Sequence, residues 1–215
     1  MKYPKLDRLY HQYLSDEDSA TFIDSVVRHY NLGTLERLAI YGQRISRRAS
    51  ILALGFLGDY SHNQILGNAL RDKDRAVRLL ADHGIRQLWF RVDDQVIRQR
   101  LGHLARLNQR GRFHEALDVA TDILGDDPSV SEAFNQRAVS FYAQGMFSDA
   151  AMDCQNAIEL NPFHFPATMT EAHCHMQVED GHQALISFRQ ALAIYPDLEN
   201  VRAQVQQLER SFDDR

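Results

Sequence analysis

The sequence predicts an all-α protein, built as a right-handed α-solenoid of antiparallel helix pairs. Apolar residues recur at helical spacing along most of the 215 residues. The second half also repeats itself with a period of 34 residues, a length typical of one helix pair with its turns. One helix pair cannot cover its own apolar face, so such pairs stack and bury a continuous core.

The 34-residue repeat is carried by small, aromatic and proline residues at fixed positions. It continues without an insertion through three units, 97–130, 131–164 and 165–198. Residues related by this offset are Ala116, Ala150 and Ala184; Pro128, Pro162 and Pro196; Phe113 and Phe147; and Gly111 and Gly145. The three units account for about half of the chain.

The middle unit shows how these residue types produce a helix pair. Two helical stretches, 131–143 and 147–160, flank a tight turn at Gly145. Two antiparallel helices need small residues where their axes approach. Ala138 and Ala150 are therefore predicted at the contact between the two helices.

The middle unit also matches the residue pattern of a known repeat family. The matching aromatic, small, turn and proline positions are Phe134, Ala138, Phe141, Gly145, Phe147, Ala150, Ala157 and Pro162. In these positions the unit resembles the tetratricopeptide repeat (TPR) family. The third unit keeps part of the pattern, with Ala172, Ala184, Phe188, Ala191 and Pro196. The resemblance implies stacked helix pairs that bind other proteins or peptides.

Two of the three units depart from the TPR pattern in their first helix. The third unit carries Thr168 and His175 at the two aromatic positions. The first unit carries Arg100 at the first aromatic position and Leu104 at the first small position. The resemblance is therefore closest in the middle unit.

A single polar helix, 198–212, is predicted to follow the third unit. Its apolar residues step by three and four: Leu198, Val201, Val205, Leu208 and Phe212. The remaining residues are rich in Gln, Glu and Arg. We expect this helix to cover the last repeat and keep its end soluble.

Residues 1–96 are predicted to form a second helical segment. A repeat of 31 residues, weaker than the first, aligns positions 47–58 with 78–89. It pairs Arg47 with Arg78, Ser50 with Ala81, Leu54 with Ile85 and Leu57 with Leu88. We therefore expect at least two related helices in this segment.

Positions 70–81 resemble the turn and second helix of a HEAT-like repeat, in which an aspartate precedes a Val-Arg pair. Here Asp72 precedes Val77 and Arg78. We expect Asp72 to cap or pair with Arg78 and with the neighbouring repeat. The earlier repeat has Tyr41 in place of the aspartate, so a polar ladder between the repeats would be incomplete.

Residues 1–32 are expected to add two helices that cap the open end of this segment. The residues predicted to face inward are Tyr10, Leu14, Phe22, Ile23, Val26, Val27 and Tyr30. Helix boundaries are predicted at Gly33 with Thr34, at Gly58, at Asp74 and at Asp93 with Asp94. No Gly/Ser-rich or Pro-rich linker separates 1–96 from 97–215, so we expect a rigid junction.

Charge divides unequally between the two segments. The net charge of -5 is the sum of +2 in residues 1–96 (14 basic, 12 acidic) and -7 in residues 97–215 (10 basic, 17 acidic). The acidic second half favours a basic partner. Arginines from Arg37 to Arg112 could instead face nucleic-acid phosphates, but many alternate with aspartates, as solvated helices require.

Composition favours a folded cytoplasmic protein. Hydrophobic residues make up 44% of the chain, and no apolar run is long enough to cross a bilayer or to serve as a signal sequence. The two cysteines, Cys154 and Cys174, lack the spacing of a redox or zinc motif. They are expected to be reduced and packed.

No catalytic or phosphate-binding motif is present, so we expect no enzyme activity and no cofactor. Glu171, His175 and Glu179 share one helical face, but His175 occupies a TPR aromatic position and is interpreted as a packed side chain rather than a metal ligand. His103, Arg137 and Glu171 occupy equivalent positions. We expect an ion pair between Arg137 and Glu171 of adjacent units.

The TPR resemblance implies a concave groove lined by the first helix of each pair. The candidate peptide-binding residues are Arg98, Asn108, Glu132, Asn135, Gln136, Val139, Tyr142, Met169, Thr170, His173, Met176 and Gln177. The chaperone-binding TPR subclass clamps a terminal carboxylate with basic residues and an asparagine. The matching positions here are Leu101, Ala105, Gln136, Pro166 and Thr170. That clamp is absent.

The favoured function is a non-catalytic interaction scaffold that binds a protein or extended peptide in this groove. The alternative is a nucleic-acid-binding or enzymatic protein that uses the basic face of residues 1–96. Self-assembly through an exposed repeat end is a third hypothesis, and the oligomeric state is left open. No membrane partner is expected.

Overall fold

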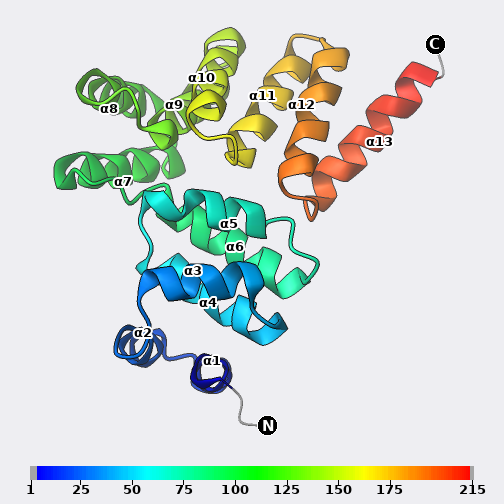
Figure 1. Ribbon diagram of the computed structural model, residues 1–215. Helices are drawn as coiled ribbons and strands as arrows, with labels where there is room; N and C mark the ends of the chain where they lie inside the picture. Colours follow the sequence, from blue (N-terminus) through cyan, green and yellow to red (C-terminus); the bar gives the residue numbers. More distant parts are fainter. Residues whose placement is uncertain (1–3, 214–215) are drawn as a thin grey trace. The chain divides into compact units, whose positions relative to one another are not determined.

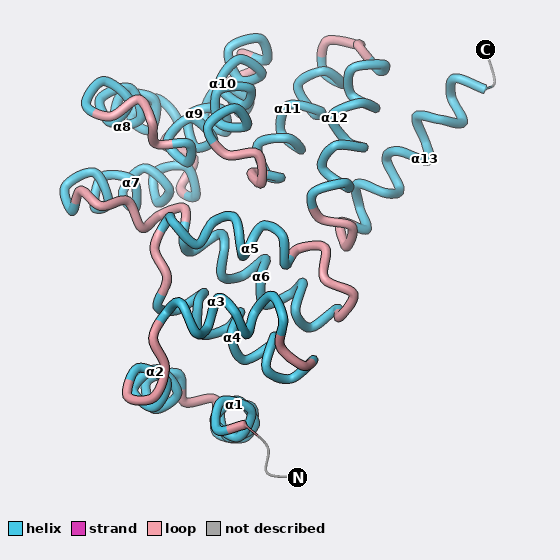
Figure 2. Tube along the Cα trace, in the orientation of Figure 1, coloured by secondary structure: helices cyan, strands magenta, loops and turns pink. Residues whose placement is uncertain are grey.

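The computed structural model describes residues 4–213, and this part of the chain is all-α, with no strand. Two compact units divide it, unit 1 up to Arg91 and unit 2 from Val92 onward. Figures 1 and 2 show helices joined by short loops throughout. The all-α prediction is confirmed.

Unit 1 is organised around one central helix. Its elements are α1 (Lys5–Asp16), α2 (Ser19–Val27), α3 (Leu32–Tyr41), α4 (Arg44–Leu57), the 3₁₀ turn η1 (Tyr60–His62), α5 (Asn63–Ala69) and α6 (Arg75–Leu88). Helix α4 contacts α1, α2, α3, α5 and α6. It is therefore the core of the unit, and most of its residues from Ser46 to Gly55 are buried.

Unit 2 is a row of helix pairs. Its helices are α7 (Gln95–Gln109), α8 (Phe113–Asp126), α9 (Ser131–Ala143), α10 (Phe147–Leu160), α11 (Phe165–Gln177), α12 (Gly181–Ile194) and α13 (Glu199–Asp213). Each helix packs on the next, and the first helices of neighbouring pairs also touch, α7 with α9 and α9 with α11. Helix α7 begins before position 97, so the first predicted unit starts inside this helix.

The turns inside the three pairs share one backbone conformation. Gly111, Gly145 and Glu179 lie 34 positions apart and have φ values of 71°, 77° and 62°. Left-handed φ suits glycine because it has no Cβ, and it strains a residue such as Glu179. The turn predicted at Gly145 is confirmed, and the third pair makes the same turn without a glycine.

Small residues fill the contact between the helices of the middle pair, as predicted. Ala138 and Ala150 are fully buried, in one cluster with Cys154, Ala157, Ala167 and Cys174. Burial raises the pKa of the Cys154 thiol, and the neighbouring Cys174 raises it further. Burial also raises the pKa of Cys174, to about 11. Both thiols are free and protonated at neutral pH, so they act as packing groups.

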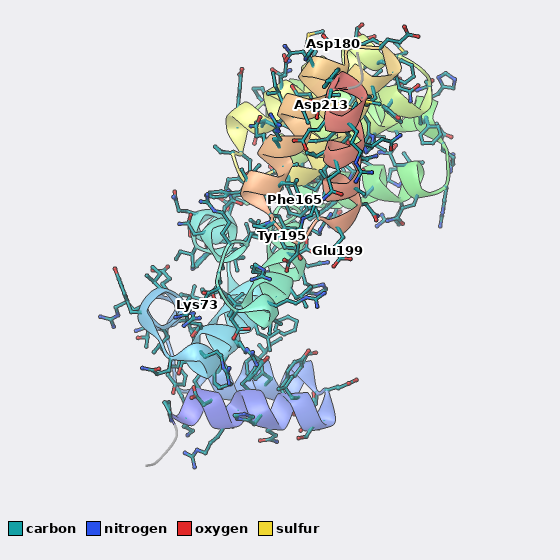
Figure 3. All side chains as sticks on the ribbon, turned by 90° about the vertical axis from the view of Figure 1, so that its right-hand side faces the viewer. Lys73, Phe165, Asp180, Tyr195, Glu199 and Asp213 are labelled. Carbon is teal, nitrogen blue, oxygen red and sulfur yellow. The ribbon has the colours of Figure 1, made fainter. Side chains whose placement is uncertain are left out.

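Helix α13 packs on the last pair as predicted. Val201 and Val205 are buried against α12. Figure 3 shows Asp180 and Asp213 toward one end of this helix pair, and Tyr195 and Glu199 toward the other.

The last turn of α13 rests on a glycine. A Cβ built on Gly181 would lie 3.2 Å from the Phe212 ring, and that ring stacks on His182 at 4.4 Å. Gly181 therefore leaves the space that the Phe212 ring occupies.

Several expectations for unit 1 are corrected. Tyr10, Phe22 and Val26 are buried as predicted, but Leu14 and Val27 are exposed, because they lie on the outer faces of α1 and α2. The boundary predicted at Gly33 is wrong: α3 begins at Leu32. The Asn31 side chain accepts from the Thr34 backbone N–H at 2.8 Å and so caps the helix.

The other predicted boundaries of the segment are confirmed. Asp74 caps α6 by accepting from the Ala76 N–H at 2.9 Å, and Asp94 caps α7 in the same way. Gly58 follows the last residue of α4. Helices α4 and α6 have equal length, and each begins and ends 31 positions from the other, as the weaker repeat predicted.

Two partly buried ion pairs tie α4 to the residues at the start of α6. Arg47 donates to both carboxylate oxygens of Asp72, at 2.8 and 2.9 Å. Arg48 donates to both oxygens of Asp74, at 3.0 and 2.9 Å. The predicted Asp72–Arg78 interaction takes another form, because Arg78 donates to the backbone oxygen of Asp72, at 2.8 Å.

Candidate functional site

The twelve predicted peptide-binding residues lie on the three first helices of unit 2. Helix α7 carries Arg98 and Asn108; α9 carries Glu132, Asn135, Gln136, Val139 and Tyr142; α11 carries Met169, Thr170, His173, Met176 and Gln177. Because α9 contacts both α7 and α11, these residues form a row across three adjacent helices. We call this row the first-helix face.

A hydrogen-bonded amide pair joins α7 to α9 within this face. The Asn108 Nδ2 donates to the backbone oxygen of Gln136 at 2.8 Å and to its Oε1 at 2.9 Å. The Ser140 hydroxyl donates to the Asn108 Oδ1 at 2.6 Å. Ser140, which is fully buried, was not among the predicted site residues. These bonds hold the two predicted amide side chains in defined orientations.

Glu132 accepts three hydrogen bonds from other side chains. Its Oε1 accepts from Gln136 Nε2 at 2.6 Å and from Asn135 Nδ2 at 3.2 Å. Its Oε2 lies 2.8 Å from His164 Nε2. His164 Nδ1 accepts from the Ala167 N–H at 3.2 Å, so Nε2 carries the proton that His164 donates. The carboxylate is thus satisfied by two side chains of α9 and by the residue that precedes α11.

Glu132 and Asn135 form the inner layer of the face. They are only 3% and 6% exposed, so they do not project from the surface. Glu132 accepts from Gln136, and Asn135 donates to Glu132. The Asn135 Oδ1 is buried with no hydrogen-bond partner among residues 4–213. His164 is fully buried and was missed as part of this cluster. Its position just before α11, where helix-capping residues lie, was the available signal.

The outer layer combines aromatic, amide and methionine side chains. Tyr142 is half-buried, and its ring contacts Phe147 edge-on at 5.4 Å. Gln177 Nε2 donates to the Tyr142 hydroxyl at 3.4 Å, which links α9 to α11. Met176 is exposed, while Met169, Thr170 and Val139 are half-buried. Exposed and half-buried side chains that a ligand could contact therefore line α9 and α11.

The two predicted groups that could carry positive charge contribute little of it to the face. His173 packs edge-on against Phe188 at 5.1 Å, and burial lowers the pKa of His173, so the ring is neutral at pH 7. Arg98 is exposed, and it donates to the backbone oxygen of Val92 at 2.9 and 2.6 Å. Its guanidinium is thus held at the start of α7.

The expected Arg137–Glu171 ion pair is wrong. Arg137 donates to both oxygens of Asp153, at 2.7 and 2.8 Å, and this hydrogen bond raises the pKa of Arg137. Glu171 instead accepts from the Ser187 hydroxyl at 3.0 Å. Both pairs span 16 positions and are centred on the turn residues Gly145 and Glu179. Antiparallel pairing within one helix pair therefore decides the partner, not stacking between units.

Many arginines of unit 1 are engaged within the unit. Besides the Arg47 and Arg48 ion pairs, Arg86 pairs with Asp82 at 2.6 Å. Arg91 donates to the backbone oxygens of Gly55 and Gly58, at 2.7 and 2.9 Å. The charges of Arg47, Arg48 and Arg86 are thus balanced locally.

The structure brings no metal-binding cluster together within residues 4–213. The helical row of Glu171, His175 and Glu179 does not converge, since Glu171 is buried and Glu179 lies exposed in the turn. No helix in the same range is both long and apolar enough to traverse a bilayer.

Comparisons with known proteins relate the chain to TPR structures. No family model and no curated protein sequence matches it. The first TPR domain of Spaghetti (RPAP3), bound to the HSP90 peptide SRMEEVD, is similar, with a TM-score of 0.54 and 19% identity. The match covers 57% of this chain and 97% of that one.

The solution structure of the first TPR domain of human RPAP3 is also similar. Its TM-score is 0.50 at 17% identity, over 54% of this chain and 91% of that one. At such low identity the likeness shows a TPR-like helical fold and no more. The HEAT-like character expected for residues 1–96 has no counterpart in these comparisons.

Proposed function

We propose that the chain is a non-catalytic interaction scaffold that binds a protein, or an extended segment of one, on the first-helix face of unit 2. The observation that carries the proposal is the hydrogen-bonded row of polar side chains that crosses α7, α9 and α11. Exposed and half-buried apolar groups lie beside this row. Such a combination suits a peptide, whose backbone needs polar partners while its side chains need apolar contacts.

Each layer of the face has a distinct part in this proposal. Glu132 holds the amide of Gln136 and Ser140 holds that of Asn108, while Asn135 donates to Glu132. Held amides lose little conformational entropy when they bind a peptide backbone. In the outer layer, the flexible thioether of Met176 and the ring of Tyr142 can adapt to ligand side chains.

The proposed partner differs in charge from the peptide seen in the similar structure. The HSP90 peptide bound to Spaghetti (RPAP3) contains two consecutive glutamates. Here, the positions that match the basic clamp carry Leu101, Ala105, Gln136, Pro166 and Thr170, none of which is charged. The net charge of -7 from position 97 onward supports a basic partner. The local pairing of arginines in unit 1 gives no support to the nucleic-acid alternative.

Panning a display library of random peptides against the full chain tests the proposal. The expected binders are rich in Lys and Arg, and their affinity falls as salt is added. Tyr142→Ala should weaken them by about tenfold, from the lost burial of one aromatic side chain. Met152→Ala is the control, because Met152 is an exposed apolar residue on α10, outside the face.

Both variants should retain the Tm of the wild-type chain within a few degrees. The proposal fails if no peptide is enriched, or if the two variants weaken binding equally. A gel shift with duplex DNA serves as a separate arm. Retarded DNA whose binding weakens steeply with salt would favour the nucleic-acid alternative instead.

A further inference from the structure

One edge of unit 1 carries basic side chains that the proposed function does not use. Arg71, Lys73 and Arg75 are exposed where the chain passes from α5 into α6, and Arg44 is exposed at the start of α4. The exposed Tyr41 ends α3, just before Arg44. We call these five residues the basic edge. We propose that the basic edge is a second interaction surface, which binds an acidic segment of a partner protein.

Internal ion pairs use the acidic residues of this part of the chain. Basic and acidic residues alternate over positions 71–75. Both acids turn toward α4, where Arg47 binds the two oxygens of Asp72 and Arg48 binds those of Asp74. The three basic residues of the same stretch are exposed and form no ion pair within residues 4–213. The charge that reaches solvent is therefore positive.

Arg44 adds a fourth positive charge. Its side chain is 71% exposed and lies 3.9 Å from Asp74, a buried carboxylate that already binds Arg48 through both oxygens. Asp7 of α1 also reaches α4, where it accepts from the Ser46 hydroxyl at 2.7 Å, but Asp7 is buried as well. Because both carboxylates are buried, the Arg44 charge faces solvent.

Hydrogen bonds hold the two turns of the basic edge side by side. Arg47, which binds Asp72, also donates to the backbone oxygen of Gly42 at 3.2 Å. This bond ties the turn after Tyr41 to the turn that carries Lys73. Helices α4 and α6 begin here and pack against each other, and packed helices lie about 8–10 Å apart. One short segment can therefore contact all four charges.

Exposed apolar groups beside these charges favour a protein as the partner. Tyr41 is 83% exposed, and the adjacent Ile40 is 54% exposed. Tyrosine and arginine are enriched among the residues that contribute most to protein–protein binding. Ile40 can contact an apolar side chain of a partner, whereas it offers nothing to a phosphate backbone. The positive charge then selects acidic residues next to that apolar side chain.

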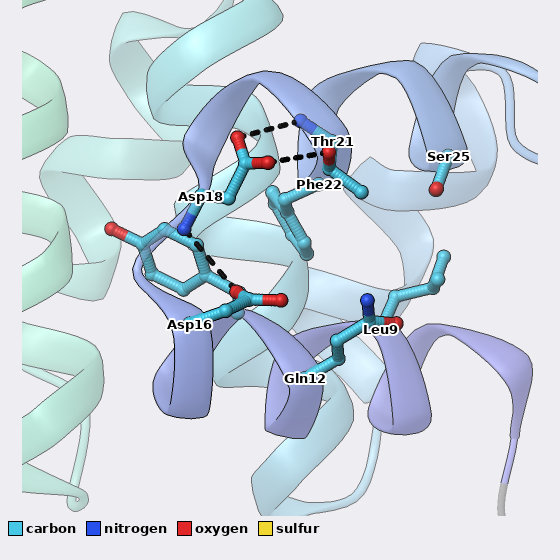
Figure 4. Close-up of a pocket in the computed structure, with 8 residues that line it drawn as sticks. Leu9, Gln12, Asp16, Asp18, Thr21, Phe22 and Ser25 are labelled. Atoms are coloured by element: carbon cyan, nitrogen blue, oxygen red, sulfur yellow. Dashed lines mark hydrogen bonds between the residues drawn. The ribbon is translucent and has the colours of Figure 1, made fainter.

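Two cavities of unit 1 lie away from the basic edge. One lies where α4 and α6 cross, at a point where a Cβ on Gly84 would lie 2.9 Å from the Cα of Gly55. The other lies between α1 and α2. Figure 4 shows that its polar groups bind one another: Asp18 accepts from both the backbone and the hydroxyl of Thr21, and Asp16 accepts from the Asp18 N–H. Neither is lined by a residue of the basic edge, so the proposed site is an open surface, as suits an extended segment.

Two blocked peptides test the basic edge by NMR on the isotope-labelled full chain, at an ionic strength of about 0.15 M. The first has one leucine between two pairs of glutamates, and the second has lysines in place of the glutamates. The glutamate peptide should shift the amide signals of Tyr41, Arg44 and Lys73. It should bind at least about tenfold more tightly than the lysine peptide, and more weakly as salt is added.

Reversal of charge locates the binding. Lys73→Glu combined with Arg75→Glu should weaken the glutamate peptide at least about tenfold. Acidic residues suit the start of a helix, so this variant should retain the wild-type Tm within a few degrees. Arg110→Glu combined with Arg210→Glu is the matched control. It changes the net charge equally at exposed residues of unit 2 and should leave the affinity unchanged.

A second pair of variants tests the apolar part of the surface. Tyr41→Ala should weaken the glutamate peptide about fivefold, because the peptide loses an apolar contact. Tyr60→Ala is its control. Tyr60 is an exposed tyrosine that follows the opposite end of α4, about 20 Å along the helix, and its loss should not affect binding.

A short duplex DNA serves as the competing ligand. If it binds the basic edge more tightly than the glutamate peptide does, the surface is one for nucleic acid and the proposal is wrong. Equal binding of the two peptides, or equal effects of the two charge-reversed variants, would overturn it as well. If the reversed variant fails to fold, Lys73→Gln with Arg75→Gln replaces it, and an unchanged affinity there also overturns the proposal. Tyr142→Ala should leave this binding unchanged, which separates these outcomes from those of the first-helix face.

Discussion

The two units join their helices by different means. In unit 2, alanines at a 34-residue spacing let the paired helices approach closely, and the partly buried Arg137–Asp153 ion pair lies inside one helix pair. In unit 1, α4 and α6 touch backbone to backbone, and two ion pairs bind α4 to the start of α6. Repeated small residues thus produce a regular stack, whereas unit 1 depends on a few individual contacts.

This difference determines where each unit is most sensitive to mutation. A repeat spreads its packing over equivalent positions, so no single one decides the stack. In unit 1 the arrangement of α4 and α6 rests on Asp74 and on the crossing at Gly55 and Gly84. Single changes there should act strongly and locally. The chain's one tryptophan, Trp89, is buried in unit 1, so its fluorescence reports this unit.

The largest effect is expected at Asp74. Asp74→Ala removes the partner of Arg48 and the cap of α6 together, and should lower the free energy of unfolding of unit 1 by about 3 kcal/mol. Urea unfolding followed by Trp89 fluorescence measures it. Asp82→Ala is the control, because its ion pair with Arg86 is more exposed and should contribute less than about 1 kcal/mol.

The contribution of Asp74 should depend on pH. Burial acts to raise the pKa of Asp74, but hydrogen bonds from Arg48 and the Ala76 N–H, with the charges of Arg48 and Arg44, lower it overall. A carboxyl group whose pKa is lowered by folding stabilises the fold at pH values above its pKa in the unfolded chain, about 3.9. This stabilisation is lost as the pH falls through the pKa of the group in the folded protein. The difference between wild type and Asp74→Asn, which keeps the cap, should shrink below about pH 4. A constant difference would contradict the ion-pair assignment.

A smaller loss is expected at the glycine crossing. Gly84→Ala places a methyl group 2.9 Å from the backbone of Gly55 and should cost unit 1 about 2 kcal/mol, because α4 and α6 must separate. Gly102→Ala in α7 is the matched change in unit 2, where the nearest atom is a flexible Arg106 nitrogen at 3.5 Å. It should stabilise its helix by about 0.5–1 kcal/mol. Destabilisation by both variants would remove the distinction between the units.

The smallest effect is expected at the turn of the third helix pair, and it should be a gain. Glu179→Gly relieves the left-handed backbone at φ 62° and should stabilise unit 2 by about 1 kcal/mol. Calorimetry should show a rise in Tm of about 2–4 °C. The reverse change in the middle pair, Gly145→Glu, should lower the Tm by a similar amount. If both substitutions raised the Tm or both lowered it, the turns of the middle and third helix pairs would not be equivalent.

The fold class and the helix pairs of unit 2 could be predicted from the sequence because their causes are local. Each helix pair needs small residues where its helices meet and a tight turn between them. Ala138, Ala150 and Gly145 provide these in the middle pair, and the 34-residue offset repeats the pattern. Unit 1 was harder. Its 31-residue offset predicted related helices, which α4 and α6 are, but nothing local indicated that Gly55 would meet Gly84.

The candidate site divides in the same way. The TPR resemblance indicated the first helices, and helical register placed the twelve predicted residues on one face of them. Register could not show that Glu132 and Asn135 would be buried, or that His164 and Ser140 would join them. Those facts depend on the distance between helices, which the packed side chains set.

By itself, then, the sequence determined an all-α chain of helix pairs, because backbone hydrogen bonding and apolar spacing act over a few residues. The tertiary structure alone decided which polar side chains meet: Asp153 for Arg137, Arg47 for Asp72 and His164 for Glu132. Partners across helices are separated by 16 to 32 positions, and only packing determines which of several suitable groups comes within hydrogen-bond distance.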